Sequence, residues 1–417
     1  MNTQTSIPGK LSLAAAALLL LASARSGLAA PHLVEGLTGT SFNLVAAPGY
    51  LSTPEGNSLY FWGYGMSAAQ YSGPTLILEQ GVPVTITLSN SLPMATSITF
   101  PGQANVTVAE VSAPSANGLL TLEAGAAGLD GNGGGVVSYT FTPTQPGTYM
   151  YQSGTQPDLQ IEMGMVGAII VRPTGFSAAA DVSGIPNPNR KAYADAASTF
   201  DHEYLFLLSD MDETIHNTVE QQVQAGTLPI TVDMSTRFAV YWFMNGRCGP
   251  DTMMPGSHPS LPVQPYDCFP VFHPGENVLM RVIGGGSDEH PLHHHGNHAR
   301  MIAQDGRLLQ SPGGSGADLG NLEFTVPSTP GSTIDTIFSW TGTGLGWDVY
   351  GHKPGEALAK GELLADHATA AHPLGFPVTL PAQQHLVDGM MYGGSPFLGT
   401  PGILPPGENQ FNANNGF

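Results

Sequence analysis

Short runs of β-branched and aromatic residues recur along the chain, and glycine, proline and asparagine separate one run from the next. In the first half of the chain these runs lie at residues 41–46, 59–63, 75–78, 84–89, 97–100, 136–142, 147–151 and 167–171. Short runs at intervals of roughly 8–12 residues, with turn residues between them, predict the strands of a β-sandwich or barrel.

The same pattern resumes in the second half, after a segment that is poor in strand signal. Further strands are predicted at residues 204–208, 238–243, 278–283, 299–303 and 333–340, and residues 212–224 are the best candidate for a helix. The sequence therefore predicts five parts, which are a signal peptide at 1–30, a β-sandwich domain at 31–175, a linker at 176–198, a second β-sandwich domain at 199–350 and an extended Pro/Gly-rich tail at 351–417.

The first 30 residues have the order of a secretory signal peptide. Lys10 is the only charged side chain before an apolar run at 11–22, and small residues follow it as far as Ala29 and Ala30. This order predicts cleavage near Ala29 or Ala30 and export to the periplasm or the medium. The apolar run is shorter than the roughly 20 helical residues that span a bilayer, and an uncleaved anchor is the alternative.

The chain is sparsely charged and strongly acidic. Charged residues make up 11% of it, and 12 basic residues against 32 acidic ones give a formal net charge of -20. Such a surface repels phosphate backbones and anionic membranes, which argues against nucleic-acid binding, but it tolerates metal cations.

Cys248 and Cys268 are the only cysteines, and a Gly/Pro-rich loop separates them. In an exported protein this arrangement predicts one disulfide that closes the loop. A metal–thiolate role is the lesser alternative.

One cluster of histidines dominates the candidate chemistry. Residues 290–298 read HPLHHHGNH, with five imidazoles in nine positions. In a strand, His293 and His295 point to one face and His294 to the other, so the first two can approach one ion. Imidazole nitrogens suit copper or zinc rather than magnesium or calcium. A polar strand edge whose histidines form hydrogen bonds within the protein is the alternative.

This cluster resembles the His-Pro-x-His-x-His-Gly motif in the last domain of multicopper oxidases, with matches at His290, His293, His295 and Gly296. Three further segments resemble strands and turns of that family, namely residues 73–76, 147–151 and 164–167. The resemblance covers most of the chain. It implies an all-β fold of two cupredoxin-like Greek-key β-sandwich domains, followed here by the extended C-terminal tail.

Most of the copper ligands of that family are replaced in this chain. The positions of its first two ligand motifs fall at residues 99–102 and 151–154, which hold no histidine. The fourth motif falls at residues 347–352, where only His352 remains and no cysteine is present. The resemblance therefore argues against a blue copper centre, a trinuclear cluster and four-copper laccase chemistry.

What the resemblance leaves is one reduced metal site. It implies that His293, His295 and His352 lie together and bind a single copper, or zinc as the alternative, with His290 as a further candidate ligand. Thr99 and Gln152 would face this ion from the first domain.

The sequence therefore predicts an exported, multicopper-oxidase-like protein that binds one metal ion and retains some copper-dependent oxidoreductase activity. The alternative is a metal-free cupredoxin scaffold that acts as a structural or protein-interaction module. Two-domain relatives in the family often form trimers, which implies a homo-oligomer here. The pattern indicates no particular substrate.

Overall fold

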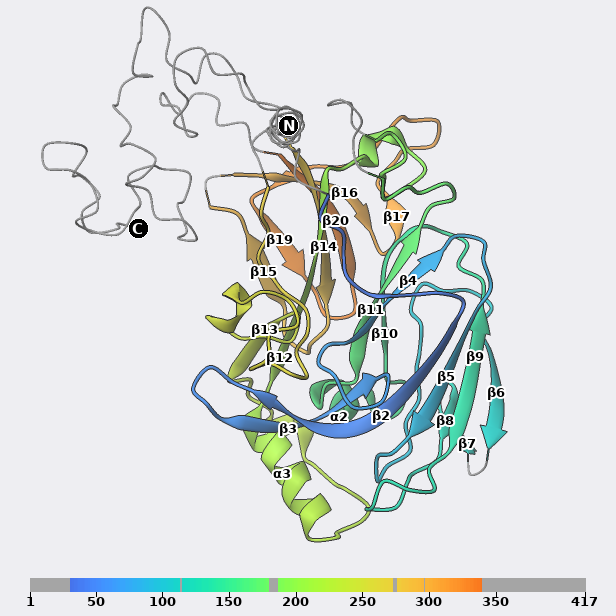
Figure 1. The fold of residues 1–417 in the computed structure, drawn as a ribbon, viewed down its shortest axis with the longest axis vertical. Coiled ribbons are helices and arrows are strands. Elements are labelled where there is room, and N and C mark those ends of the chain that lie inside the picture. Colours follow the sequence, from blue (N-terminus) through green and yellow to red (C-terminus); the bar gives the residue numbers. More distant parts are fainter. Residues whose placement is uncertain (1–30, 113–114, 180–186, 273–275, 296, 340–417) are drawn as a thin grey trace, which may run out of the picture.

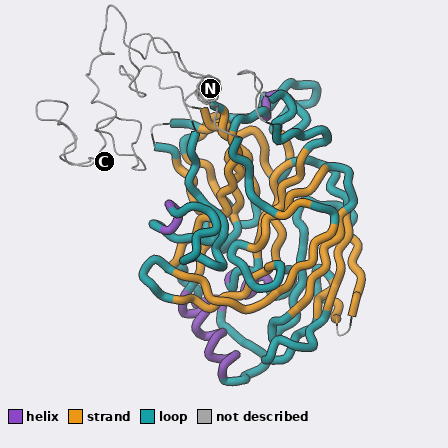
Figure 2. Tube along the Cα trace, in the orientation of Figure 1, coloured by secondary structure: helices purple, strands orange, loops and turns teal. Residues whose placement is uncertain are grey.

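The computed structural model describes residues 31–112, 115–179, 187–272, 276–295 and 297–339, and they form strands with few helices between them (Figures 1 and 2). The predicted all-β fold with cupredoxin-like sandwiches is confirmed. No helix among the described residues is both long and apolar enough to span a bilayer. The limits predicted for the signal peptide, domains, linker and tail stay predictions.

The strands up to residue 172, with helix α2, form what we call the first lobe. Its two sheets have the strand orders β3-β2-β5-β9-β6 and β1-β4-β11-β10, and β7 and β8 form a small separate pair. The bounds are β1 Leu37–Thr38, β2 Ser41–Ser52, β3 Ser58–Gly65, β4 Gly73–Glu79, β5 Val84–Asn90, β6 Thr107–Ser112, β7 Ser115–Asn117, β8 Leu122–Ala124, β9 Val136–Phe141, β10 Gly147–Gln152, α2 Pro157–Glu162 and β11 Val166–Arg172.

Alternating apolar positions build the core of the first lobe. In β2 the side chains of Phe42, Leu44 and Ala46 are buried, while their neighbours face outward. They pack in one cluster with Leu76 of β4 and Ile169 of β11, which belong to the other sheet. The period-2 pattern of the sequence therefore becomes a two-layer sandwich.

The later strands, with helix α3, form the second lobe. Its main sheet has the order β13-β12-β14-β20-β16-β17, with β18 paired to β16, and β15 pairs with β19 beside it. The bounds are η1 Ala196–Ser198, β12 His202–Met211, α3 Glu213–Gln224, η2 Met234–Thr236, β13 Tyr241–Met244, η3 Asp251–Met253, β14 Asn277–Gly284, β15 His290–His293, β16 Ala299–Gln304, β17 Arg307–Leu308, β18 Leu322–Glu323, β19 Thr325–Ser328 and β20 Thr333–Ser339.

Strand β12 is buried on both faces because it lies between the two lobes (Figure 1). Leu205 and Leu207 pack in a cluster with Phe61 of the first lobe, whereas Tyr204 and Phe206 pack with β14 and β20 in the second. This explains a ten-residue strand with no exposed position.

The carboxylate of Glu203 on β12 is fully buried and bound by two arginines from different strands. Arg172 of β11 donates to it with two nitrogens at 2.5 and 2.6 Å, and Nε of Arg281 on β14 donates at 2.6 Å. Burial alone would raise the pKa of Glu203, but these two guanidinium groups lower it to about 2. Arg281 also donates to Thr148 of β10 at 2.7 Å. A buried ionic network therefore joins the two lobes.

The main sheets of the two lobes share one strand order. The series β3-β2-β5-β9-β6 in the first lobe corresponds to β13-β12-β14-β20-β16 in the second. The registers agree as well. Ala46 lies opposite Tyr64 and Asn90, and Leu208 lies opposite Met244 and Gly284. The second sheets differ, since four strands form it in the first lobe and only β15 and β19 do so among the described residues of the second.

The predicted helix at 212–224 is confirmed as α3, and the Asp212 side chain accepts a hydrogen bond from the Thr214 amide at its N-terminus. The strand predicted at 97–100 is wrong. That segment makes only isolated bridges, from Thr96 to Ala124 and from Thr99 to Gln152. Its neighbours on either side are turns, so no continuous ladder forms.

The predicted disulfide is not formed in this structure, where Cys248 and Cys268 are both free, buried thiols. The Cys268 thiol instead donates to the carbonyl oxygen of Met244 at 2.9 Å. Burial raises the pKa of each thiol to about 12. Both cysteines therefore hold their protons at neutral pH and act as small apolar side chains.

Candidate functional site

The histidine segment begins in β15, which pairs with β19 at one side of the second lobe (Figure 1). His293 and His295 are both exposed, and their ring centroids lie 5.0 Å apart with the ring planes at 59°. The two imidazoles lie together as predicted, although β15 ends at His293 and His295 lies in the turn that follows it.

His294 points away from the exposed pair, also as predicted. Its ring stacks on Phe338 with centroids 5.3 Å apart, and its Nε2 lies 3.3 Å from the sulfur of Met280. Burial lowers the pKa of His294, and the nearby rings of His293 and His298 lower it further. His294 therefore packs against the core and is not available beside the exposed pair.

The exposed pair keeps ring nitrogens that are open to a ligand. His293 Nδ1 lies 2.9 Å from the Thr325 hydroxyl, and its Nε2 makes no hydrogen bond with another described residue. Neither ring nitrogen of His295 is bonded to a described residue either. Phe324 contacts the rings of His293 and His298 edge-on, with centroids 5.6 and 5.7 Å away. One nitrogen of each ring in the pair is free to bind a metal ion.

The structure brings together two of the three predicted ligands. His352 lies outside the described residues, so its position relative to His293 and His295 stays a prediction. Within the described part of the chain no group of three or more histidine, cysteine, aspartate or glutamate side chains is placed to hold a metal ion. The donor set fits half of a mononuclear copper or zinc site.

Thr99 and Gln152 do not contact the exposed histidines through any interaction of the described residues. They pair with each other in the first lobe, where the Thr99 amide donates to the Gln152 carbonyl at 2.8 Å and the Gln152 amide donates back at 3.2 Å. The backbones of Thr99 and Gln152 therefore bond to each other. Their predicted role beside a metal ion stays a prediction.

His290 is held by a carboxylate rather than beside the other histidines. Its Nε2 lies 2.8 Å from Oδ2 of Asp210 on β12, and the same carboxylate accepts the amides of Ser287 and Asp288 at 3.2 and 3.1 Å. Burial lowers the pKa of His290. His290 therefore has a structural role, because it fixes the start of β15 to Asp210 of β12.

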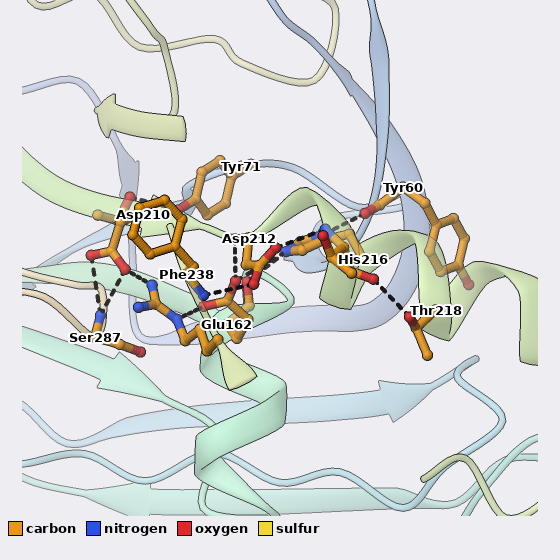
Figure 3. A network of polar contacts seen from close by, with 12 residues as sticks. Tyr60, Tyr71, Glu162, Asp210, Asp212, His216, Thr218, Phe238 and Ser287 are labelled. Carbon is orange, nitrogen blue, oxygen red and sulfur yellow. Dashed lines mark hydrogen bonds and ion pairs between the residues drawn. The ribbon is translucent and has the colours of Figure 1, made fainter. Parts of the chain in front are cut away.

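Asp210 belongs to a larger buried network that links the two lobes (Figure 3). Arg237 forms ion pairs with Asp210 and, through Nε at 2.5 Å, with Glu162 of α2. Glu162 also accepts the Asp212 amide at 2.5 Å. Burial raises the pKa of Glu162, and the hydrogen bond from Arg237 opposes that rise.

His216 of α3 lies at the other end of this network and is fully buried. Its Nδ1 lies 2.6 Å from the Tyr60 carbonyl oxygen and its Nε2 lies 3.0 Å from the Glu162 carbonyl oxygen. Burial lowers its pKa, although both carbonyl contacts favour the protonated ring. His216 therefore ties α3 of the second lobe to strand β3 and helix α2 of the first.

The sequence analysis did not single out Glu162, Arg237 or Glu203. The signal that points to Glu203 is a charged residue directly before the apolar run at 204–208. A carboxylate in a buried strand must be paired, because an isolated ion there is strongly disfavoured. The chain has only 12 basic residues, so the candidate partners are few.

Residues 56–175 match the family described as multicopper oxidase. No curated protein matches the chain in sequence. Among solved structures, the chain is similar to the multicopper oxidase mgLAC and to a blue copper oxidase from Nitrosomonas europaea, each at 18% identity and a TM-score of 0.49, over 72% of this chain and 75% of the other.

A copper nitrite reductase from Nitrosomonas europaea is also similar, with a TM-score of 0.44 and 16% identity over 73% of this chain and 85% of that one. The sequence match lies in the first lobe, which carries none of the candidate metal ligands. The match to the multicopper oxidase family is confined to residues 56–175, which run from the end of the turn before β3 to just beyond β11.

Proposed function

We propose that this protein is exported and binds one copper ion, or zinc in its place, through His293, His295 and His352. The observation that carries the proposal is the exposed pair of imidazoles, whose ring centroids lie 5.0 Å apart and whose outer nitrogens are free of bonds to described residues. Two imidazoles at positions i and i+2 of a strand can share one ion.

The shared strand order of the two lobes supports His352 as the third ligand. His293 holds the place in the second lobe that Thr99 holds in the first, three residues beyond Thr96, whose counterpart is His290. Thr99 pairs with Gln152 at the end of β10. By the same repeat we expect a counterpart of β10 after β20 that ends shortly before His352. Such a strand would bring His352 near His293.

The same residues make four-copper chemistry a poor account of this protein. The imidazole of His290 is bonded to Asp210. Both cysteines are buried thiols whose pKa is raised to about 12. A blue copper centre needs a thiolate. Copper at a three-imidazole site supplies one-electron redox chemistry. The protein's own residues would orient the ion and leave one position open to solvent.

The acidic surface supports cation binding and an extracytoplasmic location. A net charge of -20 attracts metal cations from solution and keeps the chain soluble. The order of residues 1–30 supports export. A homo-oligomer is a further part of the proposal, resting on the family resemblance alone.

The test compares metal content in three single variants of the full chain. His293→Ala and His295→Ala should each lower bound copper from about one ion per chain to a small fraction, because each removes one of few ligands. His258→Ala is the control, since among the described residues its imidazole bonds to Ser260 of its own loop and it is not a predicted ligand. Elemental analysis after desalting measures the ratio. Equal copper content in all three variants would overturn the proposal and favour a metal-free scaffold.

A further inference from the structure

An apolar face of the second lobe is exposed along the edge strand of its main sheet. Phe238, Val240 and Trp242 alternate along this segment and are 74%, 43% and 56% exposed. Beside them lies a cavity of about 280 Å³, lined by residues that include Leu208, Met244 and Leu292. A contiguous apolar face of this kind marks a surface that something covers.

The first lobe shows what covers the equivalent face. Trp242 lies opposite Asp210 in the register, and Trp62 lies opposite Pro48, so the two tryptophans hold the same place in their lobes. Val240 in turn corresponds to Tyr60. In the first lobe Tyr60 is only 5% exposed and Trp62 is completely buried.

The cover over Trp62 comes from the segment between β10 and β11. The Trp62 amide donates to the Met163 carbonyl oxygen at 2.8 Å. Leu159, Met163 and Met165 all belong to the same core cluster as Trp62. This segment and its two strands follow β9, whose Phe141 corresponds by register to Phe338 of β20.

The second lobe should therefore receive its cover from the chain that follows β20. We propose that residues 344–369 of this chain dock on the face of Val240 and Trp242 and complete the second sheet beside β15. The range follows from counting, after Phe338, the same interval that separates Phe141 from the start of β10 and from the end of β11. It contains Leu358, Leu363 and Leu364, which can fill the apolar cavity.

Covering Trp242 and its neighbours would stabilise the docked segment, because it removes apolar surface from water. A tryptophan buries roughly 150–250 Å² when it is covered, and each Å² of apolar surface removed from water contributes about 25 cal/mol. A segment of the same chain is always present at high effective concentration, unlike a second molecule. The inference does not depend on whether a metal ion binds.

The test measures how fast a cysteine on this face reacts in the full chain. Val240→Cys and Met66→Cys are labelled with a maleimide, and mass spectrometry reads each site separately from the buried native thiols. Met66 of the first lobe is 53% exposed and serves as the matched control. Docking predicts that Val240→Cys reacts at least ten times more slowly than Met66→Cys. Equal rates would overturn the proposal.

A second variant identifies the segment that gives protection. Replacing Leu363→Asp and Leu364→Asp together in the Val240→Cys chain should restore fast labelling and leave the Met66→Cys rate unchanged. Protection that survives this change, or that disappears on dilution, would overturn the proposal and assign the face to a second copy. Loss of metal binding with protection intact would count against the metal site alone.

Discussion

The histidines between residues 290 and 295 have three different environments, although they share one short segment. Asp210 holds His290, the core holds His294, and solvent reaches His293 and His295. The exposed pair on one side and His294 on the other match the prediction from spacing, even though the strand itself ends at His293. The partner of His290 was not predictable, because Asp210 lies 80 positions earlier in the sequence.

Glu203 is the residue whose replacement should cost most stability. Glu203→Gln leaves Arg172 buried without its anion and leaves Arg281 with Asp335 alone, so we expect the free energy of unfolding to fall by about 3–5 kcal/mol. Urea unfolding at pH 7 measures it. Glu110→Gln is the control, because Glu110 is exposed on β6. A loss below about 1 kcal/mol, the range of surface replacements, would contradict the assigned role of the network.

The same carboxylate predicts a pH dependence with a definite sign. Its pKa falls from an ordinary 4.5 to about 2 on folding, so its stabilisation is complete above pH 4.5 and is lost as the pH falls from 4.5 to about 2. Burial raises the pKa of Asp335 in the same network, and that group acts in the opposite direction. Unfolding followed between pH 2 and 5 should show a steeper loss in the natural chain than in Glu203→Gln. Parallel curves would refute this assignment.

At the scale of elements, the strands rich in β-branched residues were predictable and the short ones were not. The runs at 84–89 and 278–283 became β5 and β14 because their apolar positions face the cores. Strand β15 carries two histidines and a proline, which no propensity favours, and it exists because β19 pairs with it. His293 thus lies on a strand that forms because of its tertiary pairing with β19, and not because of its own sequence.

Arg237 connects three elements, since it binds Glu162 of α2 and Asp210 of β12 from the segment before β13. Arg237→Met leaves two buried carboxylates without a cation, and we expect a loss of about 3–5 kcal/mol at pH 7. The deficit should shrink at pH 4, because the carboxylates can then take up protons. Chemical unfolding at both pH values tests this. Arg307→Met on exposed β17 should change stability by less than about 0.5 kcal/mol; a similar loss in both variants would argue against the network.

At the scale of the whole molecule, the two lobes share a core as well as ions. Phe61 and Tyr71 of the first lobe pack in one cluster with Leu205 and Met211 of β12. The Tyr71 hydroxyl lies 2.5 Å from the Ser209 hydroxyl within the same interface. Neither lobe can open without exposing β12, which both cores need.

Thermal unfolding should therefore be a single cooperative transition for the full chain. Calorimetry is the measurement, with the calorimetric and van't Hoff enthalpies expected to agree. Two resolved transitions would mean that the lobes are stable separately. Their contact would then be weaker than the buried network implies.

The sequence predicted the sandwich class, because alternation and turn residues are local signals. It did not predict how the lobes contact each other, since Glu203, Arg172 and Arg281 come from three distant strands. It predicted that His293 and His295 lie side by side, and their rings do so, but their role as metal ligands stays a prediction. The third predicted ligand, His352, lies beyond the described residues, and its proposed place rests on the repeat between the lobes.

The central claim is that one metal ion binds per chain, and metal content tests it most directly. The full chain is exported into copper-supplemented medium, desalted exhaustively, and assayed for copper and zinc by elemental analysis. We predict about one copper or zinc ion per chain. A value near zero would contradict the metal site and favour the scaffold, and a value near four would contradict the absence of a multicopper centre.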